Sequence, residues 1–226
     1  MRKYEVLSLA SDGSVQESQH IAPATDAFEA AFSAFARGTM IGTIDGPCAI
    51  EDLEPGMLIT TDGAPQPVIW IGRMTLVPSA PIDDQRRLKL TRIMADSFGL
   101  ARPMPDLVLG HGARLLRTPS EMREMAMQAN ILTPARAFLD GMNVIEITPQ
   151  TPVSLYHICL PHHAIIRTAG LEVESYHPGA NLLRDMAGNT RALFLSLFPH
   201  IGTPDAFGPL AHPRAGQKTL EQLGLM

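Results

Sequence analysis

The chain has 226 residues, 45% of them hydrophobic, and a formal net charge of −5 at pH 7. This length suits one domain with appendages, and the mild negative charge argues against a nucleic-acid face, because the densest basic patch is only Arg86, Arg87 and Lys89. No apolar run approaches a membrane span, Glu5 interrupts any signal-peptide core, and the two cysteines are scattered, so we expect a cytoplasmic protein.

The N-terminal segment predicts two strands followed by a helix, one face of which would carry Phe28, Ala31, Phe32 and Phe35. Residues 3–10 and 15–21 are rich in β-forming side chains and are separated by turn residues. Thr25 or Asp26 would cap the helix, and Glu29 stands where the second partner of a capping box is expected.

A meander of short strands is predicted next, between residues 38 and 73. Apolar segments alternate here with the turn sequences Asp45-Gly46, Glu54-Pro55-Gly56 and Asp62-Gly63. The expected strands are 40–43, 48–53, 57–60 and 68–71. Short strands joined by turns indicate a mainly β fold built without βαβ units.

The remainder of the chain mixes strands and helices, with a polar loop at 78–84. Further strands are expected at 87–91, 130–132, 144–148, 153–160 and 164–168. Helical turns or helices are expected at 93–98, 118–128, 133–141, 182–198 and 217–223, because capping residues and prolines begin several of these segments and glycine ends some.

Three ordered blocks between residues 34 and 179 resemble the Hint domain, the self-processing module shared by hedgehog C-terminal domains and inteins, and more narrowly the stand-alone bacterial Hint proteins. The first block has a Phe-x-x-Gly-Thr start and a Trp-Ile-Gly-Arg end, the second an Asp-Leu segment, and the third a histidine followed by Glu-Ser. The matching residues are Phe35, Gly38, Thr39, Ile41, Thr43, Ile50, Glu51, Leu53, Pro55, Gly56, Trp70, Ile71, Gly72, Arg73, Asp106, Leu107, Leu109, Leu115, Leu116, His163, Gly170, Glu174 and Ser175.

The resemblance implies a mainly β, horseshoe-like module of short antiparallel strands with a few peripheral α-helices. It divides the chain into an N-terminal β/α segment (1–33), the Hint-like domain (34–180) and a helical C-terminal extension (181–226). The Glu174-Ser175 pair would support the site.

Two departures from the family pattern bear on activity. Family chemistry begins with a thiol or hydroxyl that attacks the preceding carbonyl, and a histidine of the second block protonates the departing amide nitrogen. Ala34 stands at the nucleophile position and Ala113 at the histidine position, while Thr39 would remain as a hydrogen-bonding group. The sequence therefore predicts a degenerate Hint protein that does not cleave itself. It would need no cofactor and would bind an unknown protein or small molecule.

A residual self-cleaving activity near residues 33–34 is the first alternative. Ser33 precedes the expected nucleophile, and His111 lies two residues before Ala113, which in an extended segment returns it to the same face. Otherwise Ser33 would be a solvated or capping hydroxyl, and His111 would sit at an exposed turn between two glycines.

A metal site is the second alternative. His157 and Cys159 share a strand face, and His163 follows after a turn; imidazole and thiolate are good ligands for zinc or copper. The spacing matches no recognised zinc-finger pattern, and His157 and His163 also stand where the family has histidines.

Overall fold

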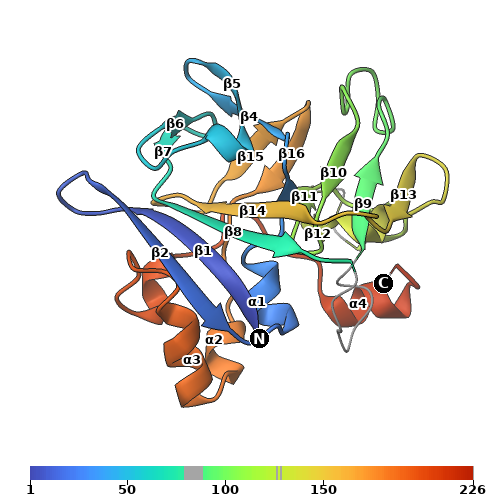
Figure 1. The fold of residues 1–226 in the computed structure, drawn as a ribbon. Helices are drawn as coiled ribbons and strands as arrows, with labels where there is room; N and C mark the ends of the chain where they lie inside the picture. Colours follow the sequence, from blue (N-terminus) through green and yellow to red (C-terminus); the bar gives the residue numbers. More distant parts are fainter. Residues whose placement is uncertain (79–88, 126, 128, 226) are drawn as a thin grey trace.

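A computed structural model describes residues 1–78, 89–125, 127 and 129–225 of the protein, and antiparallel strands dominate it (Figure 1). The first sheet has the order β13 (Val144–Ile147), β9 (Leu90–Ile93), β10 (Leu107–Leu109), β3 (Phe35–Ala36), β14 (Val153–Cys159), β8 (Trp70–Leu76), β1 (Arg2–Leu9) and β2 (Val15–Ala22). The second runs β12 (Leu132–Pro134), β11 (Arg114–Leu116), β16 (Leu171–Glu174), β15 (Ile165–Thr168), β4 (Met40–Thr43), β6 (Leu58–Ile59) and β7 (Gln66–Pro67), with β5 (Gly46–Ala49) paired to β4.

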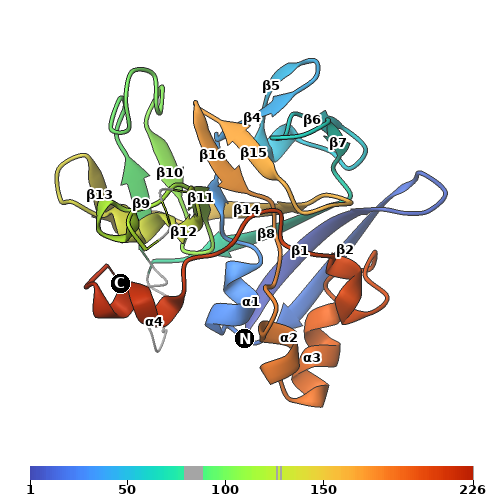
Figure 2. The ribbon, with the colours of Figure 1, turned by 180° about the vertical axis from the view of Figure 1, so that it is seen from behind.

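Helices are short and lie at the periphery of the sheets (Figures 1 and 2). They are α1 (Asp26–Ala30), α2 (Leu182–Asp185), α3 (Gly188–Leu195) and α4 (Gln217–Gln222), with 3-10 turns η1 (Ile50–Asp52), η3 (Ser120–Met122), η4 (Ala135–Phe138) and η5 (Pro204–Phe207). The prediction of a mainly β fold with a few helices is confirmed.

The N-terminal hairpin is built into the first sheet. Strand β1 pairs with β2 on one side and with β8 on the other, so it is an inner strand. Tyr4 and Val6 are buried on one face of β1, at the two-residue spacing of a half-buried strand. The strands expected at 3–10 and 15–21 are confirmed. Removal of the N-terminal segment would leave β8 with an unpaired edge.

Trp70, the only tryptophan, organises the aromatic part of the core. Its indole N–H donates to the Leu197 carbonyl at 2.7 Å, and its ring stacks on Phe198 with centroids 4.7 Å apart. Phe32 packs edge-on against the same indole at 5.2 Å. The first sheet is thereby tied both to the segment that follows α1 and to the segment that follows α3.

The C-terminal segment crosses the molecule from the α2–α3 side to α4, as Figure 2 shows. On the way, the Leu132 N–H donates to the Pro213 carbonyl at 2.8 Å, and the Ala215 N–H donates to the Leu132 carbonyl at 2.9 Å. His212 also lies 3.0 Å from the Asp62 carboxylate. Helix α4 then buries Leu220 in a small apolar cluster with Met122. These contacts fix the C-terminal segment against the second sheet.

Several sequence predictions of helices were wrong. Among the described residues of 118–128 there is the turn η3 in place of the expected helix. Met125 is 58% exposed, so these residues lack the continuous apolar face that stabilises a helix by packing. The segment 133–141 begins as strand β12, paired with β11, and continues as η4. The segment 182–198 is split, because Met186 adopts an extended conformation between α2 and α3.

The expected capping box is also absent. The Thr25 side chain makes no capping bond, and the fully buried Glu29 carboxylate instead accepts a 2.6 Å hydrogen bond from Arg2. Burial favours this choice, because a carboxylate removed from water needs a positive partner. The expected strand 48–53 is also interrupted. Strand β5 ends at Ala49, and the chain continues as the 3-10 turn η1.

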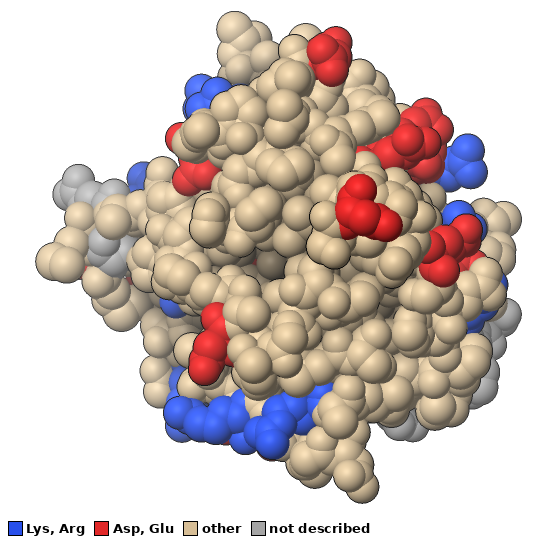
Figure 3. Space-filling model, turned by 90° about the vertical axis from the view of Figure 1, so that its left-hand side faces the viewer, with Lys and Arg blue, Asp and Glu red and all other residues tan. Residues whose placement is uncertain are grey.

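The polar loop at 78–84 and the basic patch at 86–89 fall largely outside the described residues. The face in Figure 3 has no single large patch of one charge. Basic side chains gather along its lower edge, acidic side chains are scattered, and most of the face is uncharged. Within the described ranges, none of the helices has the length and apolar character needed to cross a bilayer.

Candidate functional site

The three sequence blocks meet at Ala34. Its backbone N–H donates to the Tyr156 carbonyl in the third block, and its carbonyl accepts from the Gly110 N–H in the second, both at 2.9 Å. Ala34 is 0% exposed and Ala113 is 1% exposed, and both belong to the larger apolar cluster of the core. The Ala113 N–H donates to the Gly110 carbonyl at 3.1 Å. Both alanine side chains are therefore packed in the core.

Two glycines allow the second block to lie this close. A Cβ at Gly110 would stand less than 3.0 Å from the Ser33 carbonyl oxygen, and one at Gly112 would stand less than 3.0 Å from the Ala30 carbonyl oxygen. The Gly112 N–H donates to the Ser33 carbonyl at 3.0 Å. Because these contacts involve backbone on both sides, any larger residue would push the two segments apart.

Ser33 and His111 lie together beside this junction. The Ser33 hydroxyl is 3.1 Å from Nδ1 of His111, and Nε2 of the same ring is 3.5 Å from a carboxylate oxygen of Asp26. Ser33 is fully buried, whereas the Asp26 side chain is 73% exposed. The expectations of a solvated Ser33 and an exposed His111 tip were wrong, because the two side chains are buried against each other.

Thr39 makes hydrogen bonds that stabilise the local backbone. Its hydroxyl donates to the Ala36 carbonyl at 2.7 Å, and its carbonyl accepts from the Ile50 N–H at 2.8 Å. These bonds hold the turn between β3 and β4, which fixes the start of the first block.

His157 and Tyr176 are buried next to each other, with ring centroids 5.1 Å apart. Nδ1 of His157 lies 3.1 Å from the Ala30 carbonyl, which can only accept, so Nδ1 carries the hydrogen and Nε2 has the free lone pair. Burial lowers the pKa of His157 to about 4, which keeps the ring neutral at pH 7. Within the described ranges, Nε2 and the Tyr176 hydroxyl are buried without a hydrogen-bond partner.

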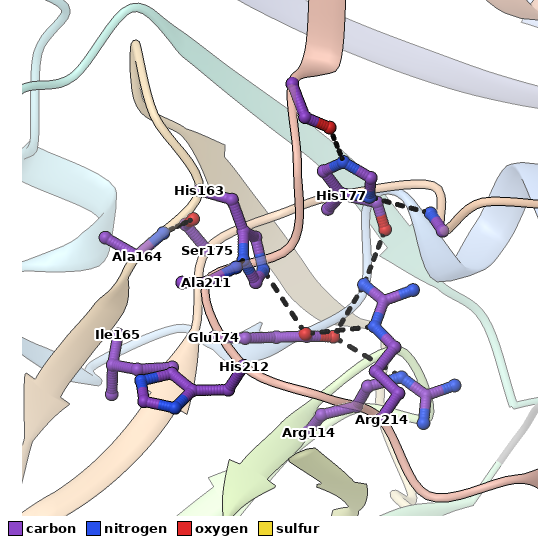
Figure 4. A network of polar contacts seen from close by, with 12 residues as sticks. Arg114, His163, Ala164, Ile165, Glu174, Ser175, His177, Ala211, His212 and Arg214 are labelled. Carbon is purple, nitrogen blue, oxygen red and sulfur yellow. Dashed lines mark hydrogen bonds and ion pairs between the residues drawn. The ribbon is translucent and has the colours of Figure 1, made fainter. Parts of the chain in front are cut away.

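Glu174 is the centre of a buried charge network (Figure 4). Arg214 reaches both carboxylate oxygens, at 3.0 and 3.2 Å, Arg114 lies at 3.3 Å and His163 at 3.4 Å. Burial alone would raise the pKa of Glu174, but the neighbouring His163 and the two arginines hold it below its usual value. Because the Ala211 N–H donates to Nδ1 of His163 at 3.0 Å, Nε2 carries the hydrogen that faces Glu174.

The candidate metal ligands His157, Cys159 and His163 have different environments and contacts. Burial raises the pKa of the Cys159 thiol well above its usual value, so it stays protonated, and His163 is turned towards Glu174. No group of three or more His, Cys, Asp or Glu side chains within the described residues is arranged to hold a metal ion. His157, Cys159 and His163 thus do not form a three-ligand site there.

A polar cleft of about 190 Å³ lies beside the junction of the three blocks. Arg114, Arg136, His157, Glu174 and Tyr176 are among its lining residues. A second cavity of about 360 Å³ adjoins it and shares His111 and Arg136 in its wall. Helix α4 contributes Gln217 and Leu220 to the cleft, so the C-terminal segment forms one of its walls.

The hydrogen bonds of Ala34 bring the three sequence blocks together, as the family resemblance implies. The sequence model of the Hint domain matches residues 33–180. The chain belongs to the Hint domain family. Among solved structures it is similar to a bacterial intein-like domain from Clostridium thermocellum, with 13% identity, a TM-score of 0.44, and coverage of 63% of this chain and 98% of that domain. No curated protein matches the chain.

Sequence reasoning missed the arginines that line this cleft. Arg214 lies in a segment that the sequence marks only by its prolines and glycines, with no signal that it reaches Glu174. Arg136 follows the Thr-Pro-Ala sequence that predicts a helix at 133–141. In such a helix, Arg136 would be one exposed charge among several. The signal that the sequence offered is Glu174 itself, because an acid in the third block requires positive partners once it is buried.

Proposed function

We propose that this Hint module does not cleave itself and instead binds a ligand in the cleft beside its former processing site. One observation carries this proposal: Ala34 and Ala113 are packed in the same apolar cluster of the core. A methyl group can neither attack a carbonyl nor donate a proton, so the reaction has neither of its two reacting groups at these positions.

The residues before the junction support the same proposal. Strand β1 lies inside the first sheet, and Phe32 packs against Trp70 in the core. A cut beside residue 34 would release a segment that contributes an inner strand and several buried rings. Such a product would have to lose its N-terminal strand or keep it bound without covalent attachment.

Intact-mass measurement tests the proposal. Purified protein is incubated for days at pH 7 and 25 °C, alone, with hydroxylamine and with a thiol, since both nucleophiles trap ester or thioester intermediates. We expect one species at the full-length mass of 24.5 kDa under every condition. Fragments that meet between residues 32 and 34 would refute the proposal.

A restoration variant sharpens this test. Ala34→Cys combined with Ala113→His returns both reacting groups, and each single substitution serves as the matched control. We expect thiol-dependent cleavage before residue 34 in the double variant only. Because both positions are tightly packed, each added side chain costs about 1–3 kcal/mol, so thermal unfolding must show that the variants remain folded.

Cleavage through Ser33 is a second candidate, favoured by its 3.1 Å contact with His111. In this reaction the Ser33 oxygen would bond to the Phe32 carbonyl carbon while the Phe32–Ser33 C–N bond breaks. His111 would take the hydroxyl proton and pass it to the departing Ser33 nitrogen, leaving an ester. Ser33→Ala and His111→Gln must both abolish any fragments; fragments that persist in Ser33→Ala would exclude this route.

A further inference from the structure

The cleft beside the junction has more positive than negative side chains. Arg114, Arg136 and Arg214 line it, against the carboxylates Glu174 and Asp26. Glu174 is already held by Arg114 and Arg214, and Asp26 is largely exposed and lies beside His111. Arg136 is therefore the arginine of this wall that an incoming anion can pair with.

Arg136 is positioned rigidly for such a role. It projects from η4, where its neighbours Ala135 and Ala137 are both buried, one in the large apolar cluster and one in the small cluster under α4. Its Nε is buried and has no hydrogen-bond partner within the described part of the chain. A buried guanidinium N–H without an acceptor costs free energy, and a carboxylate ligand would remove that cost through paired N–H···O bonds.

Two other lining residues, His157 and Tyr176, determine which hydrogen-bonding groups a ligand needs. His157 and Tyr176 are more than nine-tenths buried, and both line the cleft. The free lone pair on Nε2 of His157 accepts a hydrogen bond, and the Tyr176 hydroxyl can donate one; neither has a partner among the residues that the structure describes. A ligand that satisfies this site therefore carries an N–H or O–H donor close to its anionic group.

We infer that the cleft binds a small carboxylate that bears a neighbouring N–H or O–H, with the carboxylate on Arg136 and the donor on His157. This inference rests on the proposed binding function of the cleft. The volume of about 190 Å³ is below the roughly 300–1,000 Å³ of drug-sized sites, so it suits a ligand of amino-acid size or the last residue of a peptide. The free acid and the peptide C-terminus share the same chemistry.

Calorimetric titration of the full chain with N-acetylglycine tests the inference, with N-acetylglycinamide as the uncharged control. We expect saturable binding of the acid and at least tenfold weaker binding of the amide. Arg136→Gln should weaken the acid at least tenfold, because a charge-assisted pair is lost. Arg167→Gln removes an arginine that lines a separate cavity and should leave the affinity within twofold.

A second arm distinguishes the source of the carboxylate. Tighter binding of acetyl-tetraalanyl-glycine than of N-acetylglycine indicates a peptide C-terminus, and exclusion of that peptide indicates a free acid. Equal binding of acid and amide, no binding of any probe, or an unchanged affinity in Arg136→Gln would overturn the inference. Those results leave the intact mass unaltered, so a failure here is separate from a failure of the proposed lack of self-cleavage.

Discussion

Replacement of His157 should change how the stability of the protein depends on pH. The ring is buried, and its folded pKa is about 4, against about 6.5 in an unfolded chain. Above pH 6.5 the ring is neutral in both states. As the pH falls from 6.5 towards 4, the unfolded chain binds a proton that the folded protein does not, so stability is lost. The difference of about 2.5 between the two pKa values corresponds to about 3 kcal/mol.

The variant His157→Gln removes this titration and keeps an N–H donor for the Ala30 carbonyl. Urea unfolding at pH 7.0 and pH 4.5 gives the free energy of unfolding of both proteins. Between these values we expect the wild type to lose about 2–3 kcal/mol more than the variant. His177 and His200 also have pKa values lowered to about 4 by burial, so the variant should still lose some stability.

Equal pH dependence in the two proteins would refute this reasoning. It would mean that the folded ring titrates as it does in the unfolded chain, and hence that Nε2 reaches water or a charged partner. The neutral ring with a free lone pair, on which the carboxylate inference depends, would then be wrong as well.

Two further variants test the site directly. Glu174→Gln leaves two partly buried arginines without their shared, fully buried acid and should cost about 3 kcal/mol in urea unfolding. The exposed pair partner Arg92→Gln should cost less than about 1 kcal/mol, and similar losses in both variants would contradict a buried network. Gly112→Ala should lower the thermal midpoint of unfolding markedly, because the added Cβ would meet the Ala30 carbonyl. In the control Gly188→Ala the added Cβ has open space, so the midpoint should be unchanged or higher. An unchanged midpoint in Gly112→Ala would mean that the second block lies elsewhere.

Much of the framework followed from local sequence. The Gly-Thr and Trp-Ile-Gly-Arg motifs and the turn residues predicted short strands, and these are present as β4, β6 and β8. The family blocks also predicted that residues 34 and 113 lie near each other, which agrees with the Ala34–Gly110 and Gly110–Ala113 hydrogen bonds. The strands and turns depend on residues a few positions apart, so one sequence is enough to infer them, whereas the proximity of residues 34 and 113 follows only from the family resemblance.

The features that sequence reasoning missed depend on contacts between distant segments. Glu29 satisfies the cap pattern but pairs with Arg2, because its burial demands a cation that the helix itself cannot supply. The segment 118–128 has good helix-start signals, but too few of its described residues are buried to stabilise a helix by packing. Arg214 is linked to Glu174 only through the path of the C-terminal segment, which local sequence does not encode.

The distance along the chain between Glu174 and Arg214 has a consequence for synthesis. Forty residues separate them, which at about 5–20 residues per second is roughly 2–8 s of translation. During that interval the nascent chain already holds the acid and Arg114 but not the bidentate partner or the backbone segment that pairs with Leu132. A ribosome that stalls there leaves the wall of the cleft open and a carboxylate without its main counterion, and chaperones or proteases would meet the protein in that form.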